Sequence, residues 1–504
     1  MINLRVYGAQ AVRASLGVGL VAASVWVQVG CALPRESLPS ATAQDATATA
    51  SLWVTTGDKT RLLSLEPPLS VTRAGTGPAA DAAASIPLVI DVDPSKRYQT
   101  MVGFGASLTD ASAWLMQKVQ SPEQRSALMN ELFGRGPNGV GFEFTRLTIG
   151  ASDFSRQHYT FNDRPAGQSD LALAHFSIDA QRDDVLPVVK QALAVNPRLQ
   201  VMASPWSAPA WMKTTDSLFK GTLKPGMEAV FSRYLVRYLD AYAAEGVPIF
   251  ALTLQNEPHF EPDDYPGMRL DPAARTRIIG QHLGPLLEQQ RRSVQLIDWD
   301  HNWDDPLAPL AVLADPTARR YVQGVGWHCY AGHPQVQAGV HDTHPDKDTW
   351  FTECSGGEWK PHWPETLPWM TRTVVIGSTR HWARGVLMWN MALDENHGPH
   401  LGGCKDCRGM VTINSKTGAV TRNLEYYALA HASKFVHQGA QRIDSTSARD
   451  GVDTVAFQNP NGGSLVLVLC NSAAQARTLT VRQGGRDIHL TLPRESVATL
   501  VWAP

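Results

Sequence analysis

Short apolar runs alternate with helical patterns along most of the chain. Eight such runs occur after residue 97, and they cover 98–104, 142–149, 199–204, 249–255, 294–298, 325–330, 349–354 and 385–390. A helical pattern follows each run. Strand–helix units repeated in this way predict an α/β fold of the (β/α)8 TIM-barrel type. A doubly wound open sheet is the alternative, but no glycine-rich phosphate loop follows the first run.

Start and stop signals mark several of the intervening helices. Ser121-Pro122 predicts an N-cap followed by a proline in the first turn, and Asp271-Pro272 opens another helix. Apolar residues between 185 and 193 recur at helical spacing. The helix that begins at Met227 is expected to end at Gly246, a residue type that suits the position after a helix.

The pattern changes after residue 437, where short strand-like runs predict a small antiparallel domain. These runs are 452–457, 464–470, 478–481 and 489–492. The stretch 51–65 predicts a hairpin, which should join this domain because both ends of a barrel chain emerge near one another. We therefore expect N-terminal strands of the β-domain at 51–65, a linker at 66–97, the barrel at 98–436 and a C-terminal β-sandwich at 437–504.

The first 31 residues have the features of an export signal. Arg5 and Arg13 precede an apolar stretch at 14–29 that is short for a membrane-spanning helix. Cys31 follows a sequence similar to a lipobox, although Gln28 stands where that motif prefers Leu. A cleaved signal peptide, a lipoprotein signal and a short buried helix all stay open. Residues 32–50 predict a tether, and the protein is expected to be periplasmic, an outer-membrane lipoprotein or secreted, with a membrane contact only through Cys31.

Composition narrows the class of function. Hydrophobic residues make up 43% and charged residues 18%, which excludes a wholly disordered chain. The formal net charge is −2 and no basic block occurs, which argues against nucleic acid or an anionic membrane as the main partner. The chain has 15 Trp, and indole rings serve as flat platforms for sugar rings.

Two carboxylates follow predicted strands that lie nearly opposite one another in an eight-stranded barrel. Glu257 ends the fourth run within Gln255-Asn256-Glu257-Pro258, and Glu353 ends the seventh. Active sites of such barrels lie at the C-terminal ends of the strands. Paired carboxylates across a cleft are what glycoside hydrolysis requires. The alternative is that each Glu caps the next helix or pairs with an Arg.

Seven ordered motifs between 98 and 435 resemble glycoside hydrolase family 30, the glucosylceramidase-like group. They are 103–110 (GFGASLTD), Arg146 with 152–155 (SDFS), 203–209 (ASPWSAP), 255–258 (QNEP), 328–330 (HCY), 352–354 (TEC) and 389–390 (WN). The resemblance implies a (β/α)8 barrel with a side β-sandwich domain built from both chain ends. It also implies a retaining mechanism that needs no cofactor and no metal.

The resemblance also implies roles for the strand-end residues. Glu257 is similar to the family's acid/base, whose pKa must be raised, as partial burial can do. Glu353 is similar to the nucleophile, which must stay ionised. Asn256 resembles the residue that binds the sugar 2-hydroxyl. Arg146 is expected to support Glu353 by a hydrogen bond, with an ordinary buried ion pair as the alternative.

Further residues are similar to the family's sugar pocket. Asp110, Trp206 and Trp389 resemble the residues that surround the non-reducing sugar, although Asp110 could be an N-cap and the two indoles could be core. His328 and Tyr330 alternate along a strand and should face the site together. Tyr330 is expected to hydrogen-bond Glu353. Simple packing is the alternative for both.

Four potential metal ligands lie in one loop, His397, His400, Cys404 and Cys407. Three interpretations of this loop stay open: a zinc site, a Cys404–Cys407 disulfide, and reduced thiols. The family resemblance implies an Asn near this loop, where the chain has His400. Cys329 and Cys354 each follow a proposed site residue and should point toward the helices, and Cys470 is expected in the core.

The expected function is that of a retaining β-glycosidase that hydrolyses a β-D-glucosidic bond through a covalent glycosyl-enzyme. We expect the glucosylceramidase type, acting from the chain end, with a glycolipid or a glucan as the β-glucoside substrate. A β-1,6-glucanase with the same mechanism is the alternative. A non-catalytic sugar-binding barrel is less favoured because Glu257 and Glu353 are both present. A zinc hydrolase that uses the His/Cys loop is less favoured than either of these alternatives.

Overall fold

The computed structural model describes residues 48–75 and 88–504. The export signal and nearly all of the predicted tether lie outside these residues. Within the described ranges, no helix is both long and apolar enough to cross a membrane.

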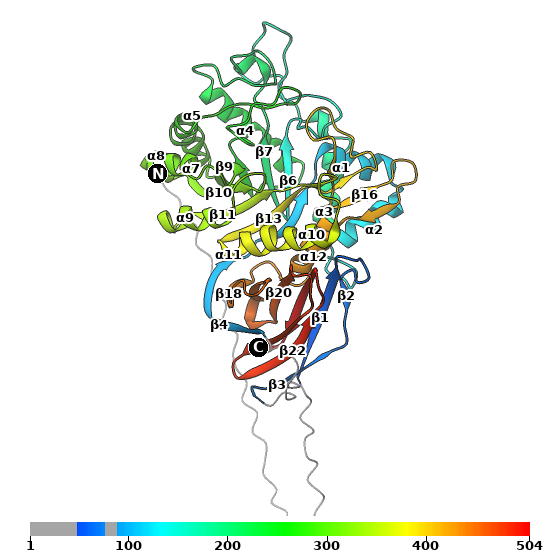
Figure 1. The fold of residues 1–504 in the computed structure, drawn as a ribbon. Helices are drawn as coiled ribbons and strands as arrows, with labels where there is room; N and C mark the ends of the chain where they lie inside the picture. The colour runs from blue at the N-terminus through cyan, green and yellow to red at the C-terminus, as the bar shows by residue number, and fades with distance from the viewer. Residues whose placement is uncertain (1–47, 76–87) are drawn as a thin grey trace, which may run out of the picture. The chain divides into compact units, whose positions relative to one another are not determined.

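A parallel eight-stranded sheet forms the predicted barrel (Figure 1). Its strands are β5 (Gly103–Ser107), β6 (Phe144–Ile149), β7 (Gln200–Pro205), β8 (Ala251–Thr253), β9 (Gln295–Asn302), β10 (Val322–His328), β11 (Asp348–Glu353) and β13 (Ala383–Asn390). The strands pair in chain order, and β13 returns to pair with β5. A Cβ at Gly105 would lie 1.8 Å from the Phe144 carbonyl oxygen, so glycine permits the close approach of β5 to β6.

Helices lie between and after these strands, and cap or spacing signals in the sequence mark four of them. They are α1 (Asp110–Trp114), α2 (Pro122–Phe133), α3 (Val185–Val195), α4 (Glu228–Ala244), α5 (Pro272–Arg277), α6 (Gly284–Gln289), α7 (Leu307–Ala314), α8 (Pro316–Arg319), α9 (Gln335–Thr343), α10 (Trp363–Met370), α11 (Ser378–Arg380) and α12 (Leu424–Ser433). The Ser121 side chain caps α2 and the Asp271 side chain caps α5. Gly246, just beyond α4, has φ +79°, a conformation that glycine adopts at little cost.

Strands from both ends of the described chain build the β-sandwich. They are β1 (Thr49–Thr56), β2 (Ser64–Leu65), β3 (Leu69–Arg73), β4 (Leu88–Thr100), β18 (Gln441–Ser445), β19 (Val452–Gln458), β20 (Leu465–Asn471), β21 (Arg477–Gln483), β22 (Arg486–Leu492) and β23 (Ser496–Trp502). The strand β1 pairs with β2 and with β23, so the predicted hairpin does join the C-terminal domain. Figure 1 shows these blue and red strands together.

The predicted linker at 66–97 is wrong for most of its described part. It contains β3 and most of β4, and β4 pairs with β18 and β21 of the sandwich. Leu88, Ile90 and Val92 alternate with outward residues, but Pro94 and the charged residues after it resemble a loop in sequence. Residues 98–100 therefore end a sandwich strand, and the first barrel strand begins only at Gly103.

A buried histidine joins the two domains. His431 of α12 lies 2.9 Å from the Thr499 hydroxyl in β23 and 2.9 Å from the Thr55 hydroxyl in β1. Burial lowers the pKa of His431 to about 3. The imidazole is therefore neutral, with one nitrogen able to donate and the other able to accept.

Candidate active site

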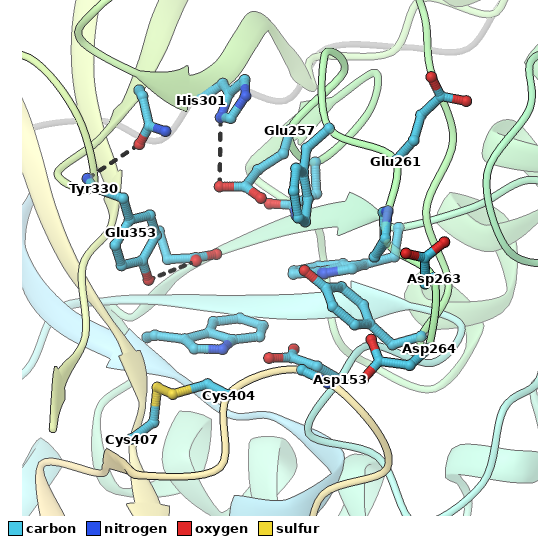
Figure 2. A pocket seen from close by; sticks show the side chains of 18 of the residues that line it. Asp153, Glu257, Glu261, Asp263, Asp264, His301, Tyr330, Glu353, Cys404 and Cys407 are labelled. Atoms are coloured by element: carbon cyan, nitrogen blue, oxygen red, sulfur yellow. Dashed lines mark hydrogen bonds and ion pairs between the residues drawn. A yellow bond between two sulfur atoms is a disulfide. The ribbon is translucent and has the colours of Figure 1, made fainter. Parts of the chain in front are cut away.

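The ends of the barrel strands bring the two predicted carboxylates to one cavity of about 800 Å³ (Figure 2). Glu353 is the last residue of β11, and Glu257 follows β8 by four residues. The backbone of Glu257 has φ +46°, a left-handed conformation that is uncommon for a residue other than glycine. Its N–H donates to the Asp300 carbonyl at 3.0 Å, which ties the turn to β9.

Two donors hold Glu353 by separate oxygens. Arg146 Nη1 donates to Oε2 at 2.5 Å, and the Tyr330 hydroxyl donates to Oε1 at 2.9 Å. Both hydrogen bonds were expected from the sequence. Donors on both oxygens fix the orientation of this carboxylate.

Arg146 connects several groups beneath the cavity. Its Nη2 donates to Asn256 Oδ1 at 2.7 Å and to Asp300 Oδ2 at 2.8 Å. The bond to Asn256 uses the amide oxygen and leaves the amide N–H₂ group for a sugar hydroxyl. The guanidinium also lies 4.8 Å from the centre of the Trp206 ring. Arg146 is therefore a central part of the site as well as an ion-pair partner.

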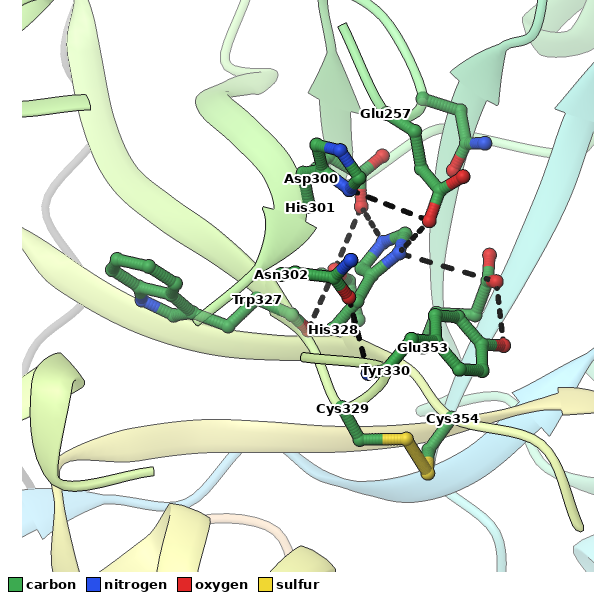
Figure 3. A network of polar contacts seen from close by, with 12 residues as sticks. Glu257, Asp300, His301, Asn302, Trp327, His328, Cys329, Tyr330, Glu353 and Cys354 are labelled. Atoms are coloured by element: carbon green, nitrogen blue, oxygen red, sulfur yellow. Dashed lines mark hydrogen bonds and ion pairs between the residues drawn. A yellow bond between two sulfur atoms is a disulfide. The ribbon is translucent and has the colours of Figure 1, made fainter. Parts of the chain in front are cut away.

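Histidines surround the candidate acid/base (Figure 3). His328 Nδ1 lies 3.1 Å from Glu257 Oε1, and its Nε2 lies 3.0 Å from Asp300 Oδ1. Although burial opposes its charge, the carboxylates of Glu353, Asp300 and Glu257 raise the pKa of His328 to about 9. His328 is thus an imidazolium at neutral pH. It does not line the cavity, as a substrate-binding residue would, but lies beneath the carboxylates.

The expectation of a raised pKa for Glu257 is wrong for the free site. Burial alone would raise this pKa, but the neighbouring imidazoles of His301 and His328 lower it below its ordinary value. His301 Nδ1 lies 3.4 Å from Glu257 Oε1. If Glu257 is the acid that the sequence predicts, it must therefore receive its proton when a substrate is bound.

The floor of the cavity is aromatic. The rings of Trp206 and Trp389 stack with centroids 5.0 Å apart, and both line the cavity as predicted. Asp153 lines it as well. Burial, together with the charges of Glu353 and Glu257, raises the pKa of Asp153 well above its ordinary value. A protonated Asp153 can donate to a sugar oxygen, a role that the sequence did not suggest for it.

Asp110 lies apart from the lining of this cavity. The side chain of Thr109, not that of Asp110, caps α1. The Asp110 carboxylate accepts a hydrogen bond from the Tyr159 hydroxyl at 2.7 Å, and Arg156 lies 3.8 Å away. The N-cap alternative is therefore wrong. Asp153, rather than Asp110, is among the carboxyl groups that line the cavity.

Two disulfides border the site. The Cys404–Cys407 disulfide is one of the three alternatives for its loop, and it removes both sulfurs as zinc ligands. Cys329 and Cys354 were expected to point toward helices, but they bond to each other. Their register explains this pairing, because His328 and Glu353 are partners on adjacent strands and each cysteine comes next. Cys470 is buried, as predicted.

Comparison with known proteins identifies the family. The model of the glycosyl hydrolase family 30 TIM-barrel domain matches residues 101–436, and that of the family 30 β-sandwich domain matches residues 439–500. The chain belongs to glycoside hydrolase family 30.

Some relatives of this family 30 hydrolase are named as endo-1,6-β-D-glucanases and others as glucosylceramidases. The chain is 33% identical over 430 residues to an endo-1,6-β-D-glucanase of Neurospora crassa, covering 82% of this chain and 88% of that one. It is 31% identical over 504 residues to endo-1,6-β-D-glucanase neg1 of Aspergillus fumigatus, covering 94% and 99%. It is 28% identical over 467 residues to lysosomal acid glucosylceramidase of Mus musculus, covering 86% and 85%. The solved structure of the endo-β1,6-glucanase BT3312 matches with a TM-score of 0.81 at 30% identity, over 90% of this chain and 100% of that one.

The rim of the family 30 site comes from two loops. The loop after Glu257 contributes residues 260–265, and a backbone N–H at Gly403 donates to Asp264 at 3.2 Å, which joins this loop to the disulfide loop. His400 packs against Phe154 with ring centroids 6.0 Å apart and is not among the residues that line the cavity. The two connected loops therefore form one side of the cavity's rim. Tyr330 and Trp359 form another part of it.

Proposed function

We propose that this glycoside hydrolase is a retaining β-1,6-glucanase, with Glu353 as nucleophile and Glu257 as acid/base. The arrangement that carries the proposal is a carboxylate held by Arg146 and Tyr330 opposite a second carboxylate in one cavity. Relatives named as β-1,6-glucanases are 33% and 31% identical, against 28% for the glucosylceramidase. These values favour the alternative over the glucosylceramidase type that the sequence alone suggested.

The first step transfers the sugar to the enzyme. Glu353 attacks the anomeric carbon, the bond to the leaving oxygen breaks, and Glu257 gives that oxygen a proton. Substrate displaces water from the cavity, which makes the charged form of Glu257 less favourable. The adjacent His328 imidazolium, 3.1 Å from Glu257, is positioned to supply the proton.

The second step releases the sugar. Ionised Glu257 takes a proton from water, the water oxygen attacks the anomeric carbon, and the ester to Glu353 breaks. Asn256, with its amide oxygen engaged by Arg146, has an N–H₂ group available to the 2-hydroxyl in both transition states. Trp206 and Trp389 provide the apolar wall for the ring.

The spacing of the carboxylates supports retention. One nitrogen, His328 Nδ1, lies 3.1 Å from Glu257 Oε1 and 4.0 Å from Glu353 Oε1. Retaining enzymes hold their carboxyl groups about 5–5.5 Å apart, whereas inverting enzymes need about 6.5–9.5 Å for an intervening water. Together the two distances place these carboxylate oxygens no more than about 7 Å apart, which is compatible with retention and excludes most of the inverting range.

A parallel product assay tests the proposal. The enzyme is incubated with β-1,6-glucan, glucosylceramide and an aryl β-glucoside, and proton NMR records the first-formed anomer. We expect β-1,6-oligosaccharides from the glucan, with the β-anomer formed first. Glucose release from glucosylceramide without cleavage of the glucan would restore the glucosylceramidase alternative. An α-anomer would refute retention.

We also propose that the protein is exported from the cytoplasm. Disulfides persist mainly in oxidising compartments, and the described residues contain two. Mass spectrometry of the mature N-terminus decides between cleavage and lipidation at Cys31. An unprocessed N-terminus would contradict export.

A further inference from the structure

Three adjoining cavities, here called the track, follow one another away from the paired carboxylates. The active-site cavity shares Tyr330 and Trp359 with a second cavity of about 510 Å³. The second cavity shares Cys329 and Trp369 with a third of about 600 Å³. Residues of the β18–β19 region line the third cavity, so the track runs along α10 to the β-sandwich.

Exposed aromatic side chains mark this track. Tyr330 is 45% exposed, Trp359 is 48% exposed and Trp369 is 38% exposed. Exposure of large apolar rings has a free-energy cost, and rings of this kind bind the flat faces of sugars. Tyr330 and Trp359 stand between the first and second cavities, and Trp369 stands between the second and third.

The backbone fixes the position of Trp359. A Cβ at Gly357 would lie 1.9 Å from the Trp359 ring, so the indole packs directly on glycine backbone. Gly356 and Gly357 form β12, which pairs with Cys407 and Arg408 of β15. The ring is therefore held in place before any ligand arrives, which reduces the entropy lost on binding.

The charges along the track favour a neutral polar ligand. The second cavity is lined by Lys360 and Glu365, and the third by Arg372, Arg380 and Asp453, so both signs of charge are present in each. A polyhydroxyl chain can bond with both signs of charge, whereas alkyl chains would leave these groups without partners. The lining thus fits a polysaccharide better than a lipid tail.

We propose that this track binds glucosyl units of a β-1,6-glucan chain beyond the cleaved linkage, with Trp359 and Trp369 as stacking platforms. This inference rests on the proposed β-1,6-glucanase function. It adds that the enzyme recognises a long segment of the chain, including units near the β-sandwich. Activity should therefore rise with the length of the substrate.

Variants of Trp369 test the track because this residue contacts neither carboxylate. We compare Trp369→Ala, Trp369→Phe and the matched surface variant Leu65→Ala on β-1,6-glucan and on gentiobiose, the β-1,6-linked disaccharide. Trp369→Ala should lower kcat/KM on the polymer about tenfold, with gentiobiose changed less than about twofold. Trp369→Phe should keep most polymer activity because it retains a ring, and Leu65→Ala should match the wild type.

The outcomes separate this inference from the proposed function. Suppose that the wild type cleaves β-1,6-glucan. If Trp369→Ala then lowers activity equally on the polymer and the disaccharide, or on neither, only the proposed track is overturned. A wild type inactive on β-1,6-glucan overturns both. A second experiment leaves Trp369 unchanged and uses calorimetry to measure how tightly the Glu353→Gln variant binds oligosaccharides of different lengths. Affinity must rise from the disaccharide to a hexasaccharide, and a flat affinity overturns the track.

Discussion

At the scale of the residue, His328 joins the acid/base to the rest of the charged network. It lies between Glu257 and Asp300, and Asp300 also accepts from Arg146, which holds Glu353. A substitution at any one of these groups therefore changes the electrostatic environment and the hydrogen bonds of the others. In the proposed mechanism the catalytic proton belongs to the Glu257–His328 pair, whose two titrations are linked.

Replacement of His328 should move the alkaline limb of the pH profile. The pKa of His328 is raised to about 9, so the pair keeps its proton up to about that pH. In His328→Gln the shared site is lost, and Glu257, whose pKa is still lowered by His301, gives up its proton at lower pH. We expect the alkaline limb of kcat/KM to shift downward and kcat to fall about tenfold or more. Rate profiles of both enzymes from pH 4 to 10 measure this, and an unshifted limb would contradict the shared proton.

Removal of the acid should affect substrates according to their leaving groups. In Glu257→Ala, substrates with poor leaving groups should lose about 10²- to 10⁴-fold in kcat, because no group protonates the departing oxygen. Activated aryl glycosides should lose far less, and azide should restore their rate with a β-azide product. Equal losses on both kinds of substrate would remove Glu257 from this role.

The sequence could identify only part of this network. Glu257, Asn256 and Glu353 stand in short strand-end motifs, which is why they could be predicted. Asp300 and His301 lie within β9, where positive φ angles at Trp299 (+75°) and Asp300 (+55°) break the strand's regular alternation. No alternation rule assigns the direction of side chains past such a break.

At the scale of the element, the adjacent strands β10 and β11 position the proposed nucleophile and the imidazolium beside the proposed acid/base. His328 and Glu353 end them, and the Cys329–Cys354 disulfide joins the residues that follow. The register of two strands decides this pairing, and register cannot be deduced from one sequence. The eight barrel runs could be predicted because they are mostly apolar, whereas the mixed composition of β4 concealed a strand.

Loss of the Cys329–Cys354 disulfide should destabilise the protein and impair catalysis. The bond closes a loop of sequence separation 25, and such a cross-link contributes about 2–4 kcal/mol to the free energy of unfolding. The Cys329→Ser/Cys354→Ser variant is compared with Cys404→Ser/Cys407→Ser, whose separation is only 3. Urea unfolding should show the larger loss for the first pair. A larger loss for the second pair would contradict this account.

At the scale of the whole molecule, the sandwich and the barrel meet through buried polar contacts. The neutral His431 bonds with one threonine from each end of the chain, Thr55 and Thr499. The sequence predicted that both chain ends build the sandwich, but it gave no sign of this contact. Protonation of His431 would leave an imidazolium without an anionic partner among its two bonded groups.

Acid should therefore weaken the folded protein through His431. Its pKa is about 3 when folded and about 6.5 when unfolded, so the unfolded chain takes up the proton first as the pH falls. The stabilisation is complete above about pH 6.5 and is lost progressively toward pH 3. Between pH 7 and 5, the wild type should lose about 2 kcal/mol more than His431→Gln in urea unfolding. Equal losses would show that His431 does not set this dependence.

In the proposed mechanism, Glu353 forms a covalent bond to a β-1,6-linked glucosyl unit. A 2-deoxy-2-fluoro β-gentiobioside with an activated leaving group should trap this intermediate, because the fluorine slows its hydrolysis. Peptide mass spectrometry should find the fluorinated disaccharide on Glu353 in the wild type and no adduct in Glu353→Gln. An adduct on another residue, or none at all in an enzyme that turns over the activated substrate, would contradict the account.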